Sequence, residues 1–138
     1  MLWRKKKSLQ GIAQQLQDSP EEDIIETAKK LRAIASEMMF QKKFADARTA
    51  TEEAILLFER IPNPDRYLSG CYALLEEILK GTGEHGKAME ARRAAIKYSP
   101  LGLHPRIEQE IRKQVRQLAY YAFQFLISPH SHPAVRSR

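Results

Sequence analysis

Alanine recurs at matching positions in two segments of this chain, residues 43–62 and residues 86–100. The matching residues, at a constant shift of 41 positions, are Ala47, Ala50, Ala54 and Ile55 in the first segment and Ala88, Ala91, Ala95 and Ile96 in the second. Because small residues rather than catalytic groups repeat, the pattern predicts close packing between helices. We therefore expect the chain to fold by stacking two similar helical units.

Start signals and apolar spacing predict an all-α fold of about five helices and no strand. Ser19, Pro20 and Glu22 predict a helix start with a capping box. Asn63 with Pro64 predicts a second start of the same kind. The expected helices run from about residue 20 to 41–43, then over about 45–60, 65–80, 87–98 and 105–127. Since the turns are short, the fold class is a stack of antiparallel helical hairpins followed by a long C-terminal helix.

The two hairpins resemble the tetratricopeptide repeat over about residues 20–100. The matching residues are Leu31, Ile34, Ala35, Met38, Phe44, Ala47, Ala54 and Pro62 in the first unit and Tyr72, Leu75, Leu79, Ala88, Ala95 and Pro100 in the second. The spacing of 41 departs from the usual spacing of about 34. His85 also stands where an aromatic residue is normal. A hairpin stack of another lineage would carry the same marks. In a repeat stack, the helix from Pro105 would be the cap that covers the end.

The resemblance implies a non-enzymatic protein–protein interaction module, such as an adaptor, chaperone or assembly factor. Members bind a protein segment or subunit on the concave face formed by the first helix of each hairpin. The groove positions carried onto this sequence are Lys29, Arg32, Ser36, Met39 and Phe40, with Gly70, Ala73, Leu74, Glu77 and Lys80 from the second unit. Ser36 and Leu74 stand where a carboxylate clamp needs asparagines, which argues against that particular ligand. The alternative for Met39 and Phe40 is that they are core residues.

The net charge of +6 lies in the two tails, because residues 18–127 hold 17 charges of each sign. Residues 1–18 form a basic segment in which a short amphipathic helix is expected. Its patch consists of Trp3, Arg4, Lys5, Lys6 and Lys7. An alternative function is binding of nucleic acid or an anionic membrane surface through this patch. We prefer the simpler interpretation, a solvated terminus or an extra helix packed on the stack.

Nothing in the sequence indicates catalysis, a cofactor or a metal ion. Phosphate-binding loops, nucleophile elbows and paired cysteine motifs are absent. Adjacent Glu76 and Glu77 are expected on a solvated face. His104 is expected to be an ordinary loop residue. His130 and His132 have no third ligand and lie in residues 128–138, a tail expected to be disordered. Residues 19–127 are expected to form one helical domain.

Aromatic side chains extend too far around the last predicted helix to face a single core. Tyr120, Tyr121 and Phe123 are therefore candidates for a homo-oligomer interface. Cys71, the single cysteine, is expected to be a small core residue. No run reaches the ~18 apolar residues of a membrane span, and no apolar signal region follows the basic patch. The chain is accordingly expected to be cytoplasmic.

Overall fold

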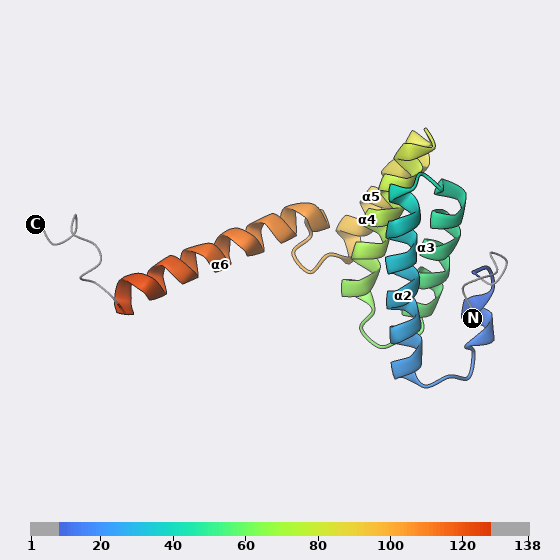
Figure 1. Ribbon diagram of the computed structural model, residues 1–138, viewed down its shortest axis with the longest axis horizontal. Coiled ribbons are helices and arrows are strands. Elements are labelled where there is room, and N and C mark those ends of the chain that lie inside the picture. Colours follow the sequence, from blue (N-terminus) through green and yellow to red (C-terminus); the bar gives the residue numbers. More distant parts are fainter. Residues whose placement is uncertain (1–8, 128–138) are drawn as a thin grey trace, which may run out of the picture. The chain divides into compact units, whose positions relative to one another are not determined.

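The computed structural model describes residues 9–127 of the chain (Figure 1). Over this range the regular structure is entirely helical. The elements are α1 (Ile12–Gln15), α2 (Glu21–Phe40), α3 (Phe44–Phe58), α4 (Asp65–Gly81), α5 (His85–Tyr98) and α6 (Pro105–Ile127). The chain forms two compact units, Met1–Pro105 and Arg106–Arg138. The first unit therefore contains α1 to α5, and α6 belongs almost wholly to the second.

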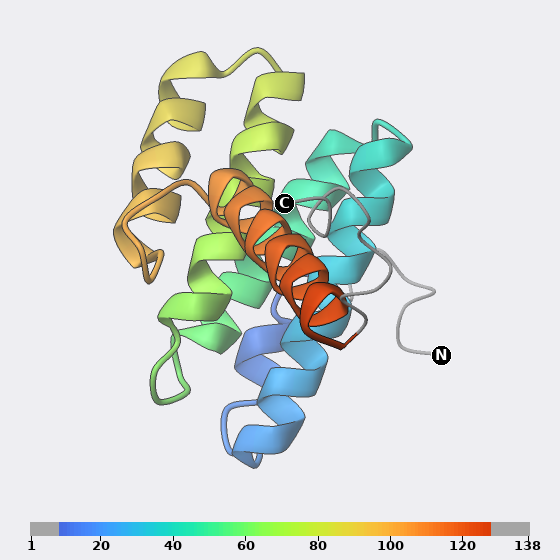
Figure 2. The same cartoon turned by 90° about the vertical axis from the view of Figure 1, so that its left-hand side faces the viewer.

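Two antiparallel hairpins make up the body of the first unit (Figures 1 and 2). Helix α2 packs along α3, α4 packs along α5, and α3 joins the hairpins by packing on α4. The shift of 41 also holds at the helix ends. Helix α2 ends at Phe40 and α4 ends 41 residues later, at Gly81. Likewise, α3 begins at Phe44 and α5 begins 41 residues later, at His85. The prediction of an all-α stack of hairpins is confirmed.

The repeated alanines lie where the helices approach each other. All six are buried, with no more than 4% of any side chain exposed. Two apolar clusters build on them, and the larger joins α1, α2, α3 and α4. The rings of Phe58 and Tyr67 stack across the turn between the hairpins, with centroids 4.7 Å apart and planes 2° from parallel. Small residues and one aromatic stack thus fix how one hairpin lies on the next.

Helix starts differ from the prediction in their capping. Helix α2 begins at Glu21 behind an extended Pro20, with φ −59° and ψ 153°, and no side chain caps it, so the capping box predicted from Ser19 is wrong. Pro20 itself occupies the cap position, one residue later than expected, and it has no side-chain acceptor to offer. Three acidic residues in the first turn instead complement the partial positive charge of the helix start.

The chain before α2 adds a sixth, very short helix, α1, within the segment of residues 1–18 where a short helix was expected. Leu9 and Ile12 are buried in the larger cluster, and Leu16 packs against it partly buried. The backbone N–H of Ala13 donates a 2.9 Å hydrogen bond to the buried carboxylate of Glu53 on α3. Residues 9–16 therefore fit the interpretation of an extra element packed on the stack. The basic patch of residues 3–7 lies outside the described residues.

Helix α6 confirms the prediction of a long C-terminal helix. Every residue from Gln109 to Ile127 is exposed, the apolar side chains included. The role of α6 as a cap on the stack therefore stays a prediction. Among residues 9–127, no helix is both long enough and apolar enough to cross a membrane.

Candidate functional site

The face shared by α2 and α4 carries the predicted groove positions. The two helices are the first of their hairpins and lie next to each other. The guanidinium of Arg32 lies directly over Gly70, since a Cβ built on Gly70 would be 2.6 Å from an Nη atom of Arg32. The Nζ atom of Lys29 lies 5.8 Å from the centre of the Tyr67 ring. Two of the predicted residues on α2 thus contact α4 directly.

The remaining groove positions differ in their exposure. Ser36 and Met39 on α2 and Ala73 and Glu77 on α4 are half-buried. Phe40, at the end of α2, differs from these four residues because it is 77% exposed. The alternative that Phe40 is a core residue is therefore wrong, and Met39 is only partly covered. The binding role of these residues stays a prediction.

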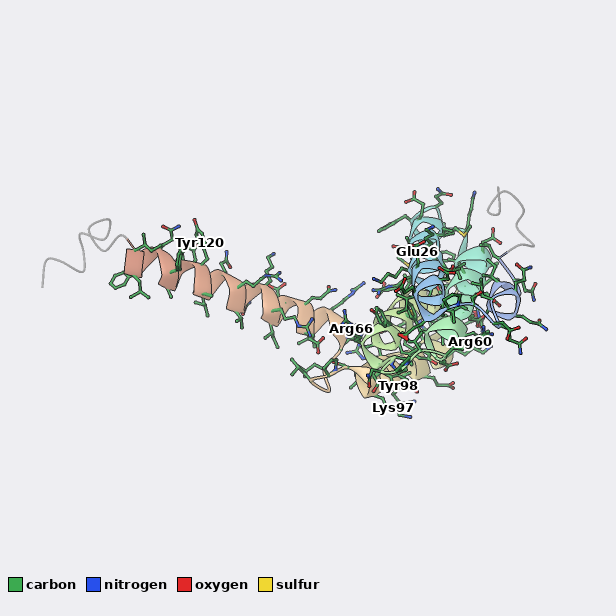
Figure 3. The ribbon with its side chains drawn as sticks, turned by 90° about the horizontal axis from the view of Figure 1, so that it is seen from below. Glu26, Arg60, Arg66, Lys97, Tyr98 and Tyr120 are labelled. Atoms are coloured by element: carbon green, nitrogen blue, oxygen red, sulfur yellow. The ribbon has the colours of Figure 1, made fainter. Side chains whose placement is uncertain are left out.

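The face carries cations on both helices and a carboxylate on α4. Lys29 and Arg32 place two cations on α2, whereas Glu77 places a carboxylate on α4, 3.9 Å from Lys80. Arg66 adds a cation at the start of α4, with its guanidinium 5.0 Å from the Tyr67 ring centre (labelled in Figure 3). The face therefore offers cations, one carboxylate, half-buried positions of mixed polarity and one exposed aromatic ring.

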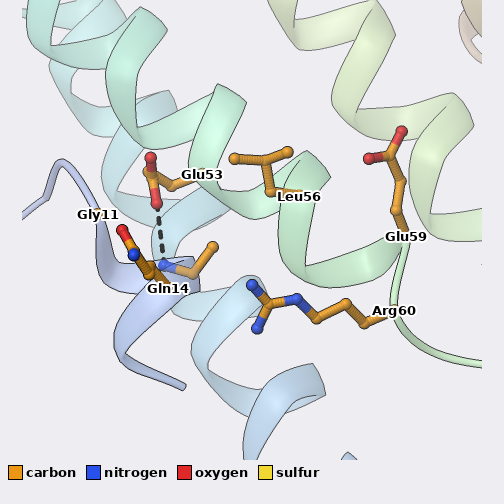
Figure 4. Close-up of a pocket in the computed structure, with 7 residues that line it drawn as sticks. Gly11, Gln14, Glu53, Leu56, Glu59 and Arg60 are labelled. Atoms are coloured by element: carbon orange, nitrogen blue, oxygen red, sulfur yellow. Dashed lines mark hydrogen bonds between the residues drawn. The ribbon is translucent and has the colours of Figure 1, made fainter. Parts of the chain in front are cut away.

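A cleft of about 400 Å³ lies on a different surface, between α1 and α3 (Figure 4). It is lined by Gly11, Ala13, Gln14, Glu53, Leu56, Glu59 and Arg60. None of these residues was a predicted site residue, and no motif in the sequence indicates the cleft. Its buried carboxylate, Glu53, is occupied by the hydrogen bond that holds α1 on α3. The cleft is best explained as a by-product of that packing.

Glu76 is a buried carboxylate that the sequence assigned wrongly to a solvated face. Only 1% of its side chain is exposed, and it accepts a 2.8 Å hydrogen bond from Nε2 of His104. Lys80 lies 3.1 Å and Arg92 3.3 Å from its other oxygen. His104 is likewise buried rather than an ordinary loop residue. The cluster joins α4, α5 and the loop after α5.

The pKa of Glu76 follows from these contacts. Burial alone would raise it, but the hydrogen bonds from His104 and Lys80, and then the charges of these two groups, outweigh burial and lower the pKa below its ordinary value. Glu76 is thus held ionised near neutral pH. With its oxygens engaged by three basic side chains, it is a structural anion and not a general acid or base.

The repeat itself contained a signal for Glu76. At the shift of 41, Glu76 corresponds to Ala35, which is fully buried on α2, and Ser69 corresponds to Ala28, also fully buried. Ser69 donates a 2.7 Å hydrogen bond to the backbone carbonyl of Ala95. The second hairpin therefore places polar side chains at inward positions that the first fills with alanine. No comparable signal marks His104, because its burial depends on the path of the loop.

Cys71 is a core residue, as predicted. Burial raises the pKa of its thiol to about 12, against a smaller lowering by the charge of Arg32. The thiol therefore stays protonated at neutral pH and is a poor nucleophile. Within residues 9–127, no group of three or more His, Cys, Asp and Glu side chains is placed to hold a metal ion. His130 and His132 lie outside that range.

The three aromatic residues proposed for an oligomer interface are all on α6. Tyr120, Tyr121 and Phe123 are 58%, 60% and 59% exposed, and the two tyrosine rings meet edge to face at 5.9 Å. Figure 3 shows Tyr120 among side chains that project from all around the helix. Their exposure fits an interface without showing one.

Comparisons of the chain with protein-family models, with curated proteins and with solved structures found no match. The stacked hairpins are therefore known from the structure alone, and the relation to the tetratricopeptide repeat stays a hypothesis.

Proposed function

We propose that this chain is a non-enzymatic protein–protein interaction module, an adaptor, chaperone or assembly factor of the tetratricopeptide-like kind. It binds a segment or subunit of another protein along the face shared by α2 and α4. The observation that supports this most is the register of the two helices. Because Arg32 lies over Gly70 and Lys29 lies beside the Tyr67 ring, the groove positions of α2 border those of α4, and α2 ends in the exposed ring of Phe40.

The chemistry of this surface indicates the kind of segment it would bind. An exposed aromatic ring supplies the apolar area and geometry on which binding energy concentrates in protein interfaces. The two cations of α2, Lys29 and Arg32, favour a carboxylate, and Arg32 can hold one with two parallel hydrogen bonds. The expected ligand is therefore a segment with an apolar side chain next to an acidic one.

A peptide library displayed on phage and selected against the full-length chain tests the proposal. Selected peptides should lose at least about tenfold in affinity with Phe40→Ala, and also with Arg32→Ala, when Kd is measured by fluorescence anisotropy. Met89→Ala is the matched control, since Met89 is also a large apolar side chain, 49% exposed, but lies on α5. Circular dichroism should show the same helical content for all three variants.

Selected peptides that bind all the variants equally would contradict the proposed face. Binding that instead falls with added salt and is lost when Lys5, Lys6 and Lys7 are replaced by glutamate would support the alternative function through the basic patch.

A further inference from the structure

Helix α6 presents one apolar side along most of its length. Ile107, Ile111, Val115 and Leu118 recur at spacings of three and four, which places them in a single stripe. Each is at least 40% exposed, and Leu118 reaches 69%. A continuous apolar stripe of this kind on a protein surface marks a site of interaction.

The charges on the polar side of α6 have one sign beyond Glu110. No acidic residue occurs from Ile111 to the C-terminus, whereas Arg112, Lys113 and Arg116 lie on α6. Arg112 and Arg116 are four residues apart and therefore share one side of the helix. Arg112 also pairs with Glu108, Nη to Oε at 3.3 Å. The stretch is thus complementary to an anionic surface, and a second copy of the same helix packed in parallel would bring like charges together.

The apolar part of α6 widens toward its C-terminal end. Eight of the nine residues from Ala119 to Ile127 are apolar or aromatic. Tyr120 lies one turn and Phe123 two turns after Arg116, so both share the side of the helix that carries Arg116. On that side, basic residues therefore give way to aromatic ones. Tyrosine combines an apolar ring with a polar hydroxyl, which suits the boundary between lipid and water.

We propose that α6 docks on an anionic lipid bilayer, lying in the plane of its surface. The stripe enters the boundary between headgroups and acyl chains, where an amphipathic helix buries its apolar side. Arg112 and Arg116 lie on the polar side of the helix, and their long side chains let the guanidinium groups reach lipid phosphates. This contact is separate from the face of α2 and α4 and does not depend on the function proposed for it.

Flotation of the full-length chain with lipid vesicles tests the proposal. The chain should float with vesicles of phosphatidylcholine containing phosphatidylserine, and floating should decrease with vesicles of phosphatidylcholine alone and with added salt. Leu118→Glu should weaken binding at least about tenfold, because it loses the burial of a leucine side chain. Gln117→Glu adds the same charge on the polar side of the same turn and should change binding far less.

Four results would overturn the proposal. One is no binding to phosphatidylserine vesicles, and another is equal loss of binding in the two glutamate variants. The third is a chain that is dimeric by light scattering, becomes monomeric with Leu118→Glu and does not float, since a second copy would then cover the stripe. Retained binding in Leu118→Glu together with loss on replacing Lys5, Lys6 and Lys7 would assign the contact to the basic patch instead and likewise overturn it.

Discussion

Two adjacent glutamates on α4 have different environments. Glu76 is enclosed by His104, Lys80 and Arg92, while its neighbour Glu77 is half-buried beside Lys80. A buried carboxylate stabilises a fold only when its hydrogen bonds and countercharges offset the loss of water. His104, Lys80 and Arg92 supply both to Glu76, and its pKa is accordingly lowered. At the residue scale, this one side chain joins α4 and α5 to the loop that follows α5.

The pH dependence of stability should reflect Glu76. Its pKa in the folded state is below the ordinary value of 4.5, so its ionised form stabilises the fold above about pH 4.5. That contribution is lost as the pH falls through the folded-state pKa, because the unfolded chain then binds the proton first. Glu76→Gln should therefore lower the free energy of unfolding at pH 7 by about 2 kcal/mol, measured by urea denaturation.

The difference between the wild-type chain and Glu76→Gln should shrink below pH 4.5, since protonation removes the same charge. Glu77→Gln is the matched control and should change stability by less than about 1 kcal/mol, as expected for a partly exposed carboxylate. A constant difference between the wild-type chain and Glu76→Gln from pH 7 to pH 3 would contradict the assignment.

At the scale of elements, the sequence predicted the helices better than their caps. The repeated alanines and the prolines of residues 62–64 determine the backbone conformation of their own segments. The bounds of five helices could therefore be predicted to within about two residues. The cap at Ser19 and the solvated position of Glu76 were wrong, because each depends on backbone conformation or on a distant contact. The groove positions could be placed on one face because α2 and α4 share a register, yet their binding role needs a partner to test it.

Two glycines offer a paired test of how the hairpins meet. Gly81 ends α4, and a Cβ added there would run into the ring of Phe44 at the start of α3. Gly86, in the first turn of α5, has open space where its Cβ would be. Gly86→Ala should therefore raise the free energy of unfolding by up to about 1 kcal/mol through helix propensity.

Gly81→Ala should not stabilise the fold in the same way, because the Phe44 ring must move away from α4 to make room for the new methyl group. The free energy of unfolding should therefore stay unchanged or fall by about 1 kcal/mol. Thermal unfolding followed by circular dichroism separates the two variants. Equal stabilisation by both would show that Phe44 does not pack on α4 in solution.

At the scale of the whole molecule, the boundary at Pro105 separates a packed stack from an exposed helix. The last polar anchor of the stack, His104, lies immediately before that boundary, and its 2.8 Å hydrogen bond to Glu76 stays within the first unit. The stack should therefore keep its stability without α6 but not without the loop that carries His104.

Two truncated chains test this division. A chain ending at Pro105 should unfold in urea with a free energy within about 1 kcal/mol of the full-length value, because residues 109–127 are exposed. A chain ending at Pro100 should be less stable by a further 2 kcal/mol or so, since Glu76 then loses its closest hydrogen-bond donor while remaining buried. Introducing Glu76→Gln into both chains should reduce the gap between them, because the two changes remove the same interaction. An equal loss of stability in the two truncated chains would instead show that residues 106–138 support the stack and that the two units are not independent.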